Sequence, residues 1–120
     1  IFSTRLLKGE QPIINGDGKQ TRDYVFVGDV VKANVITLND NNSDIYNIGT
    51  GIETDVNQLF NYLNKITNAN KDEKHGPAAP GEQMRSVITS EKIFNKFGWR
   101  PTTKLEDGLK ATVDFFKSNM

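Results

Sequence analysis

Cysteine is absent from this 120-residue chain, and His75 is its only histidine. Without cysteine the protein can form no disulfide, thiol nucleophile or thiolate metal site, and a single imidazole excludes sites that need two. No apolar run approaches the roughly 20 residues that a membrane-spanning helix needs. The 15 basic and 15 acidic side chains cancel, which argues against a general nucleic-acid binder because such proteins are normally basic.

The chain has the length of one domain, and a chain of this size buries about two-thirds of its unfolded surface when it folds. It begins with Ile1 rather than methionine, and it shows no signal peptide. We therefore expect either that a segment has been removed or that the chain is a piece of a longer protein.

Hydrophobic periodicity predicts a mixed α/β fold (α+β) of about five helices and four short strands, in a single unit of residues 1–120. Runs of β-branched and aromatic residues indicate the strands, and apolar residues three and four apart indicate the helices. The expected strands cover residues 12–14, 24–27, 45–48 and 86–88, and the expected helices cover about 1–9, 29–38, 54–66, 90–97 and 103–116.

Capping residues predict where the helices begin. Asp29, Thr54 and either Thr89 or Ser90 are expected N-caps, because their side-chain oxygens can accept hydrogen bonds from the first free amides of a helix. The last helix is expected to open with a capping box that begins at Thr103.

Motifs that could carry chemistry alone are weak. Gly49-x-Gly51-x-x-Thr54 resembles a dinucleotide-binding fingerprint, but Thr54 replaces the third glycine, and no acidic residue stands about twenty residues later at the end of a clear next strand. A plain turn is the better interpretation of this segment. His75 lies in a polar stretch and is expected to be solvated, and no metal-ligand set or Gly-x-Ser-x-Gly elbow can be assembled.

Two arginines stand where a loop meets an expected strand. Arg22 precedes the strand at 24–27, and Arg85 precedes the strand at 86–88. The planar fork of arginine suits a phosphate or diphosphate, and open α/β proteins bind ligands at strand ends. A structural ion pair is the alternative for each. The two arginines can form one diphosphate clamp only where the fold brings them together.

Several segments together resemble one enzyme family. Residues 12–33 read PIINGDGKQTRDYVFVGDVVKA, which is similar to the central signature of NAD-dependent nucleotide-sugar epimerases and dehydratases. These are the extended short-chain dehydrogenases, typified by UDP-glucose 4-epimerase. The later motifs of the family follow in order over nearly the whole chain, as YNIGTG at 46–51, PGEQMRS at 80–86, FGWRP at 97–101 and LEDGL at 105–109.

The resemblance implies a C-terminal, substrate-binding part that holds a nucleotide sugar. The Rossmann domain of the family, with its Gly-rich loop for NAD and its Tyr-x-x-x-Lys pair, has no counterpart here, since no tyrosine is followed by lysine four residues later. In the whole enzyme, NAD would oxidise the sugar at C4 and return the hydride after the keto sugar rotates. We therefore expect this fragment to bind no NAD and to catalyse nothing alone, within a cytoplasmic isomerase or related lyase.

Five residues correspond to ligand-binding positions of the family and form the candidate substrate site. Arg22 corresponds to its diphosphate-binding arginine, and Glu82 to an acidic residue that bonds the ribose hydroxyls. Ile14 and Asn15 correspond to the strand that lies along the base. Arg85 is a further candidate ligand from the last motif.

The chain departs from the family at Ala79, where many relatives carry a second diphosphate-binding arginine. Either Arg85 replaces that arginine, or the grip on the diphosphate is weaker. The expected ligand is a UDP- or dTDP-sugar. A dTDP-sugar dehydratase, an ADP-heptose epimerase and a non-catalytic binding or interaction module of the same ancestry stay open as alternatives.

The resemblance also implies that roughly residues 29–50 pack on the absent Rossmann half of the same chain. This segment contains an apolar helical stripe of Val31, Val35 and Leu38. Without its partner, the stripe is expected to be exposed, repacked or buried in a homodimer.

Overall fold

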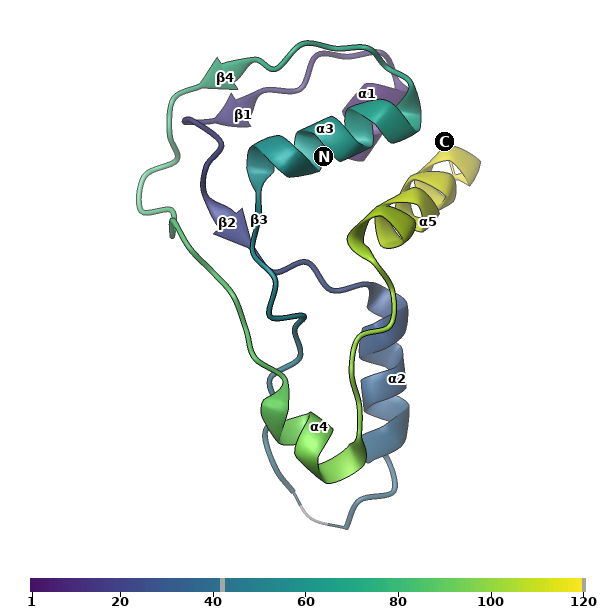
Figure 1. Ribbon diagram of the computed structural model, residues 1–120. Coiled ribbons are helices and arrows are strands. Elements are labelled where there is room, and N and C mark those ends of the chain that lie inside the picture. The colour runs from purple at the N-terminus through teal and green to yellow at the C-terminus, as the bar shows by residue number, and fades with distance from the viewer. Residues whose placement is uncertain (42, 120) are drawn as a thin grey trace.

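The computed structural model describes residues 1–41 and 43–119, which contain five helices and four two-residue strands (Figure 1). The expected mixed α/β fold is confirmed. β1 pairs in parallel with β4, and β2 pairs antiparallel with β3, so the strands form two small ladders. In chain order the elements are α1 (Phe2–Leu7), β1 (Ile14–Asn15), β2 (Thr21–Arg22), α2 (Val27–Thr37), β3 (Thr54–Asp55), α3 (Val56–Thr67), β4 (His75–Gly76), α4 (Glu91–Phe97) and α5 (Leu105–Ser118).

Two separate hydrophobic clusters hold the chain together. One joins α1, β1, α3 and α5 in the upper part of Figure 1, and the other joins α2, α4 and the segment after α4 in the lower part. The molecule is therefore elongated, with extents of 49 × 34 × 19 Å and a radius of gyration of 16.5 Å, against about 14 Å for a compact domain of this length. The buried residues of the upper cluster are Leu6, Ile14, Phe60, Leu63 and Val113, and those of the lower cluster are Ala33, Ile93 and Trp99.

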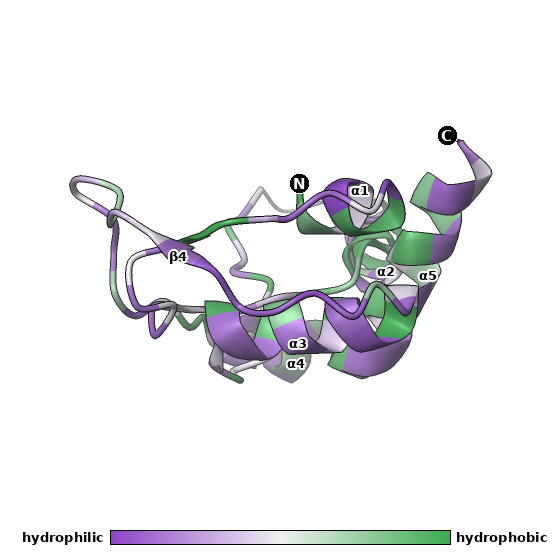
Figure 2. Cartoon of the chain, turned by 90° about the horizontal axis from the view of Figure 1, so that it is seen from above, coloured by the Kyte–Doolittle hydropathy of each residue, from purple (hydrophilic) through white to green (hydrophobic). Residues whose placement is uncertain are grey.

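The two longest helices lie where the periodicity predicts them, but their caps differ from the expectation. The Asp55 carboxylate accepts the Gln58 amide at 2.7 Å, and the Gln58 side chain accepts the Asp55 amide at 3.1 Å, so Asp55 rather than Thr54 caps α3. α5 has no side-chain cap, so the capping box predicted at Thr103 is wrong. Both helices alternate hydrophobic and hydrophilic residues around their circumference (Figure 2), as helices with one buried face do.

Asp29 is not an N-cap, because α2 already begins at Val27. Its side chain is only 1% exposed, and its carboxylate accepts hydrogen bonds at 3.1 Å from the Thr102 hydroxyl and the Thr103 amide. The Trp99 indole donates to the Asp29 carbonyl at 3.0 Å. Burial alone would raise the pKa of Asp29, but the hydrogen bonds from Thr103 and Thr102 outweigh it and lower the pKa. Asp29 thereby connects α2 by hydrogen bonds to the segment that precedes α5.

The strands differ most from the expectation. Three of the expected strands are absent from the described part of the chain, because no strand there pairs with the residues concerned, 24–27, 45–48 and 86–88. The expected strand at 12–14 becomes β1, shifted toward the C-terminus. A strand is defined by its hydrogen-bonded neighbour, which local β propensity does not supply.

Candidate functional site

Arg22 lies at the end of the β2–β3 ladder, opposite Thr54. The chain reaches it through a turn in which Gly16 and Gly18 have positive φ angles of 65° and 72°, a conformation that glycine adopts without strain. The carbonyls of Gly18 and Gln20 accept the first amides of the α3 region, from Asn57 and Val56. The C-terminal end of this turn is therefore fixed to the start of α3.

Arg22 and Glu82, 60 positions apart in the sequence, come together at this edge. A guanidinium nitrogen of Arg22 lies 3.9 Å from a Glu82 carboxylate oxygen, and each side chain is about a third exposed. Another nitrogen of Arg22 donates to the carbonyls of Thr21 and Gln83, both at 2.6 Å. Because arginine carries five N–H groups, donors remain for a ligand.

Gln20 joins Glu82 to Asn15, although Gln20 is not among the residues expected from the sequence. Its amide nitrogen donates to the Asn15 carbonyl at 3.1 Å and to a Glu82 carboxylate oxygen at 3.0 Å. We call Asn15, Gln20, Arg22 and Glu82 the Arg22 cluster. The two-residue spacing of Gln20 and Arg22 along extended chain is the signal that could have identified Gln20, because it puts both side chains on one face.

Tyr24 lies within electrostatic reach of the Arg22 cluster. Burial raises the pKa of the Tyr24 phenol, the positive charge of Arg22 lowers it and the negative charge of Glu82 raises it, with a raised pKa as the result. The phenol therefore stays protonated at neutral pH and can act as a hydrogen-bond donor or acceptor beside the cluster.

Ile14 and Asn15 occupy opposite environments in β1. The Ile14 side chain is fully buried in the upper hydrophobic cluster, so only its backbone can lie along a ligand. Asn15 is exposed. The amides of Ile14 and Gly16 donate to β4 and its flank, so the Asn15 backbone faces the opposite edge, where Gln20 meets it.

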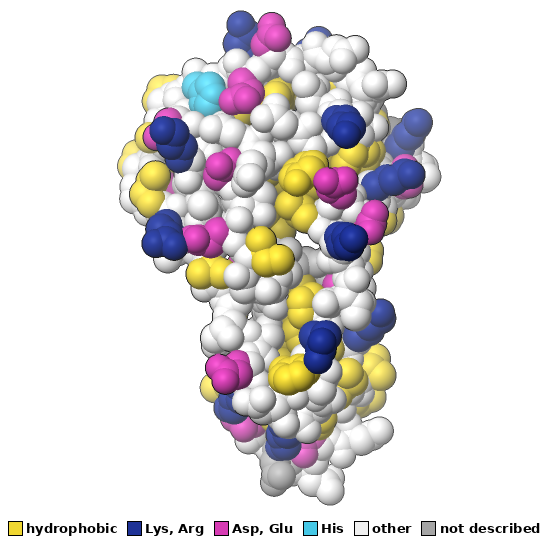
Figure 3. Space-filling model, in the orientation of Figure 1, with side chains coloured by type: hydrophobic (Ala, Val, Ile, Leu, Met, Phe, Trp, Pro, Cys, Tyr) yellow, Lys and Arg dark blue, Asp and Glu magenta, His cyan; other side chains and the backbone are white. Residues whose placement is uncertain are grey.

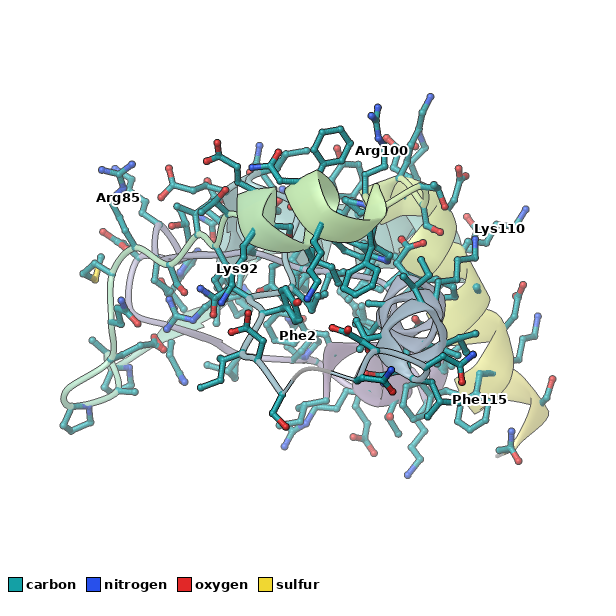
Figure 4. All side chains as sticks on the ribbon, turned by 90° about the horizontal axis from the view of Figure 1, so that it is seen from below. Phe2, Arg85, Lys92, Arg100, Lys110 and Phe115 are labelled. Atoms are coloured by element: carbon teal, nitrogen blue, oxygen red, sulfur yellow. The ribbon has the colours of Figure 1, made fainter. Side chains whose placement is uncertain are left out.

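Arg85 lies on the other face of β2 from Arg22. Its guanidinium forms two hydrogen bonds of 2.8 Å to the Glu53 carboxylate, which also accepts the Thr21 hydroxyl at 3.0 Å. These two partners lower the pKa of Glu53. The Arg85 side chain is 78% exposed and points away from the molecule in Figure 4. The structure does not bring Arg85 next to Arg22.

Asp23, the neighbour of Arg22, binds the Gly49–Gly51 turn. Its carboxylate accepts hydrogen bonds from the amides of Thr50, Gly51 and Ile88, at 2.9 to 3.2 Å, and from the Thr50 hydroxyl at 2.6 Å. Burial would raise the pKa of Asp23, but these hydrogen bonds lower it. The amides that a dinucleotide diphosphate would need are thus already used.

His75 makes structural contacts. Its Nδ1 lies 2.7 Å from the Gly16 carbonyl oxygen, and its Nε2 lies 3.2 Å from a carboxylate oxygen of Glu73. Within residues 1–41 and 43–119, no group of three acidic, histidine or cysteine side chains could hold a metal ion. In the same residues, every helix is too short or too polar to cross a lipid bilayer.

Comparison with known proteins finds similarity along nearly the whole chain. The family described as GDP-mannose 4,6 dehydratase matches residues 2–112. A UDP-glucose 4-epimerase of Mycolicibacterium smegmatis is 36% identical over 119 residues, which are 98% of this chain and 38% of that protein. The chain therefore spans well under half the length of this relative.

Two crystal structures have the same fold. The UDP-glucose 4-epimerase of Thermotoga maritima, solved with UDP-glucose, has a TM-score of 0.93 and 42% identity over 98% of this chain and 38% of its own. The UDP-glucose 4-epimerase of Thermus thermophilus, solved with NAD, has a TM-score of 0.85 and 32% identity over 99% of this chain and 39% of its own.

Proposed function

This chain belongs to the GDP-mannose 4,6-dehydratase family of NAD-dependent nucleotide-sugar epimerases and dehydratases, and we propose that it is the part of such an enzyme that holds the nucleotide sugar. Since the chain spans 38% of the Mycolicibacterium relative, the enzymatic activity is a proposal for a longer protein. Both solved epimerases and that relative favour a UDP-sugar 4-epimerase, while the family model favours a dehydratase as the alternative.

The observation that carries the proposal is the meeting of Arg22 and Glu82 across 60 positions of sequence. In the proposed site, the free N–H groups of Arg22 bind the diphosphate, for which a planar cationic fork is suited. The Glu82 carboxylate accepts hydrogen bonds from the ribose hydroxyls. The exposed edge of β1 at Asn15, with the backbone of Ile14, lies along the base.

Arg85 stays in the proposal as a second cation for the diphosphate, in place of the arginine that Ala79 lacks. To reach the ligand it would have to leave Glu53. Because that ion pair is exposed on the Arg85 side, exchanging it for a phosphate costs little. If Arg85 stays paired with Glu53, Arg22 is the one arginine of the two that binds the diphosphate, and the diphosphate is bound more weakly.

The cofactor belongs to the part of the protein outside this chain. NAD would supply the hydride acceptor there, and the residues described here would bind and orient the sugar nucleotide, which is how a protein assists cofactor chemistry. The occupied amides of the Gly49–Gly51 turn support this division. A Gly-rich loop and a Tyr-x-x-x-Lys pair in the remaining sequence would favour the enzyme over a non-catalytic module.

The outer face of α2 is proposed to dock on that remaining part. Val31, Val35 and Leu38 are exposed by 52%, 64% and 77%, while Ala33 on the opposite face is buried. Figure 3 shows hydrophobic side chains over the lower part of the molecule, where α2 lies. The accessible surface of 8090 Å² exceeds the roughly 6,500 Å² of a compact monomer of this mass, as expected when a partner is absent. Residues 29–50 would form this interface.

The test is calorimetric titration of the full-length protein with UDP, dTDP and ADP. We expect UDP or dTDP to bind, and Arg22→Ala to weaken binding at least tenfold because a charge-assisted contact is lost. Arg100→Ala is the matched control, since the Arg100 guanidinium lies 4.7 Å from the ring centre of Phe94 on α4, away from the Arg22 cluster. Unchanged affinity in Arg22→Ala, or binding of ADP alone, would contradict the proposal.

A further inference from the structure

Gln20 is a buried polar side chain placed between the two groups that the proposed site offers to a nucleoside. Its side chain is 5% exposed. One amide hydrogen goes to the Asn15 carbonyl and the other to the Glu82 carboxylate, at 3.1 and 3.0 Å. Because a primary amide has two N–H hydrogens, both are used and neither is left for a ligand.

The backbone of Gln20 is fixed as firmly as its side chain. Its carbonyl accepts the Val56 amide at 3.2 Å, and the next residue, Thr21, pairs with Asp55 in the β2–β3 ladder. The amide group of Gln20 therefore projects from a rigid base. Glutamine has three side-chain torsions, and burial with two hydrogen bonds holds them in one conformation.

Glu82, by contrast, stands on a turn that follows β4 by several residues. Its amide donates to the Ala79 carbonyl at 3.3 Å, and its carboxylate has Arg22 at 3.9 Å on one side and Gln20 at 3.0 Å on the other. The Gln20 contact is the shorter of the two, and it occupies one carboxylate oxygen. The remaining lone pairs of Glu82 stay free to accept hydrogen bonds.

We propose that Gln20 is a positioning residue that fixes the Glu82 carboxylate relative to the Asn15 backbone, so that ribose and base are recognised together. The inference rests on the proposed function, because it takes Glu82 as the ribose-binding group. Gln20 acts through Glu82 and Asn15 and touches no substrate. Its removal lets the carboxylate rotate, which weakens recognition of the ribose hydroxyls.

The test compares UDP with its 2′,3′-dideoxy analogue in the full-length protein. Wild-type protein is expected to prefer UDP about tenfold, because the analogue leaves the Glu82 carboxylate without its hydroxyl partners. In Gln20→Met, which keeps the length of the side chain and removes its donors, UDP is expected to bind about tenfold more weakly and the two ligands to bind alike. In the UDP-sugar reaction, Gln20→Met is expected to have a higher KM than the wild-type protein and the same kcat.

Gln11→Met is the matched control, because the Gln11 amide also bridges two groups, the carbonyls of Pro12 and Asp72, both at 3.0 Å. It should leave the preference for UDP unchanged. If Gln20→Met does not fold, Gln20→Leu removes the same donors without adding a charge and must show the same loss of preference. If either folded variant keeps the tenfold preference for UDP, the role proposed for Gln20 is wrong while the proposed function stands. Wild-type protein that fails to bind UDP overturns the proposed function instead.

Discussion

The Thr50 hydroxyl donates to the Asp23 carboxylate at 2.6 Å, and the Thr50 amide donates to both oxygens of the same carboxylate at 3.0 Å. The same side chain also accepts the amides of Gly51 and Ile88. One carboxylate thus connects three segments that are 27 to 65 positions apart in the sequence. Because Asp23 directly follows Arg22, this connection also holds the end of β2 that carries the proposed diphosphate ligand.

Replacing Asp23 should destabilise the protein. In Asp23→Ala, the amides of Thr50, Gly51 and Ile88 lose their acceptor, and we expect a loss of about 2 kcal/mol in the free energy of unfolding. Urea denaturation followed by circular dichroism measures it. Asp17→Ala is the control, since Asp17 is exposed and accepts one local amide, from Lys19. Equal losses in the two variants would contradict the role given to Asp23.

Acid should weaken the fold through Asp23 and Asp29, whose folded-state pKa values both lie below the ordinary 3.8. A carboxyl group with a lowered folded-state pKa contributes stability above its unfolded pKa, and the contribution is lost as pH falls through the folded pKa. The unfolding free energy should therefore fall as pH decreases below about 5. In Asp29→Asn the unfolding free energy should depend less steeply on pH. Urea midpoints measured at several pH values below 7 test this, and the same pH dependence in the variant and the wild-type protein would contradict it.

Gly18 should tolerate a side chain less well than a glycine with open space around it. Its φ of 72° is left-handed, which costs about 1–2 kcal/mol for other residues, and an added Cβ would collide with the Asn57 side-chain oxygen. Gly81→Ala is a matched control, because Gly81 has a φ of 73° and open space around its Cβ position. The thermal midpoint should fall more in Gly18→Ala than in Gly81→Ala. A larger loss at Gly81 would show that the Asn57 contact is not limiting.

The docking proposal for α2 predicts a context-dependent effect of Val35→Lys. In the 120-residue chain the Val35 side chain is 64% exposed, so the variant should change the thermal midpoint little. In the full-length protein the lysine would be buried without a partner, and the midpoint should fall by several degrees. Light scattering of the 120-residue chain tests the alternative occupant, since a homodimer that Val35→Lys dissolves would assign this face to a second copy.

Residues in local patterns are the ones that the sequence predicts correctly. The apolar spacing of α3 and α5 depends on contacts within a few residues. The strand predictions at 24–27, 45–48 and 86–88 are wrong because a strand requires a pairing partner, and local propensity says nothing about that partner. The cap of α3 is wrong by one residue, since Thr54 and Asp55 are both suitable acceptors.

The same division applies to the candidate site. The sequence by itself determined the approximate positions of the helices and the motifs that identify the family, because each is a property of neighbouring residues. Only the tertiary structure decided that Arg22 meets Glu82, that Gln20 bridges Glu82 to Asn15 and that Arg85 pairs with Glu53 on the opposite face. Apart from the short span between Asn15 and Gln20, these contacts join residues 32 to 62 positions apart, and the pairing of β2 with β3 and the path of the chain after β4 set their distances.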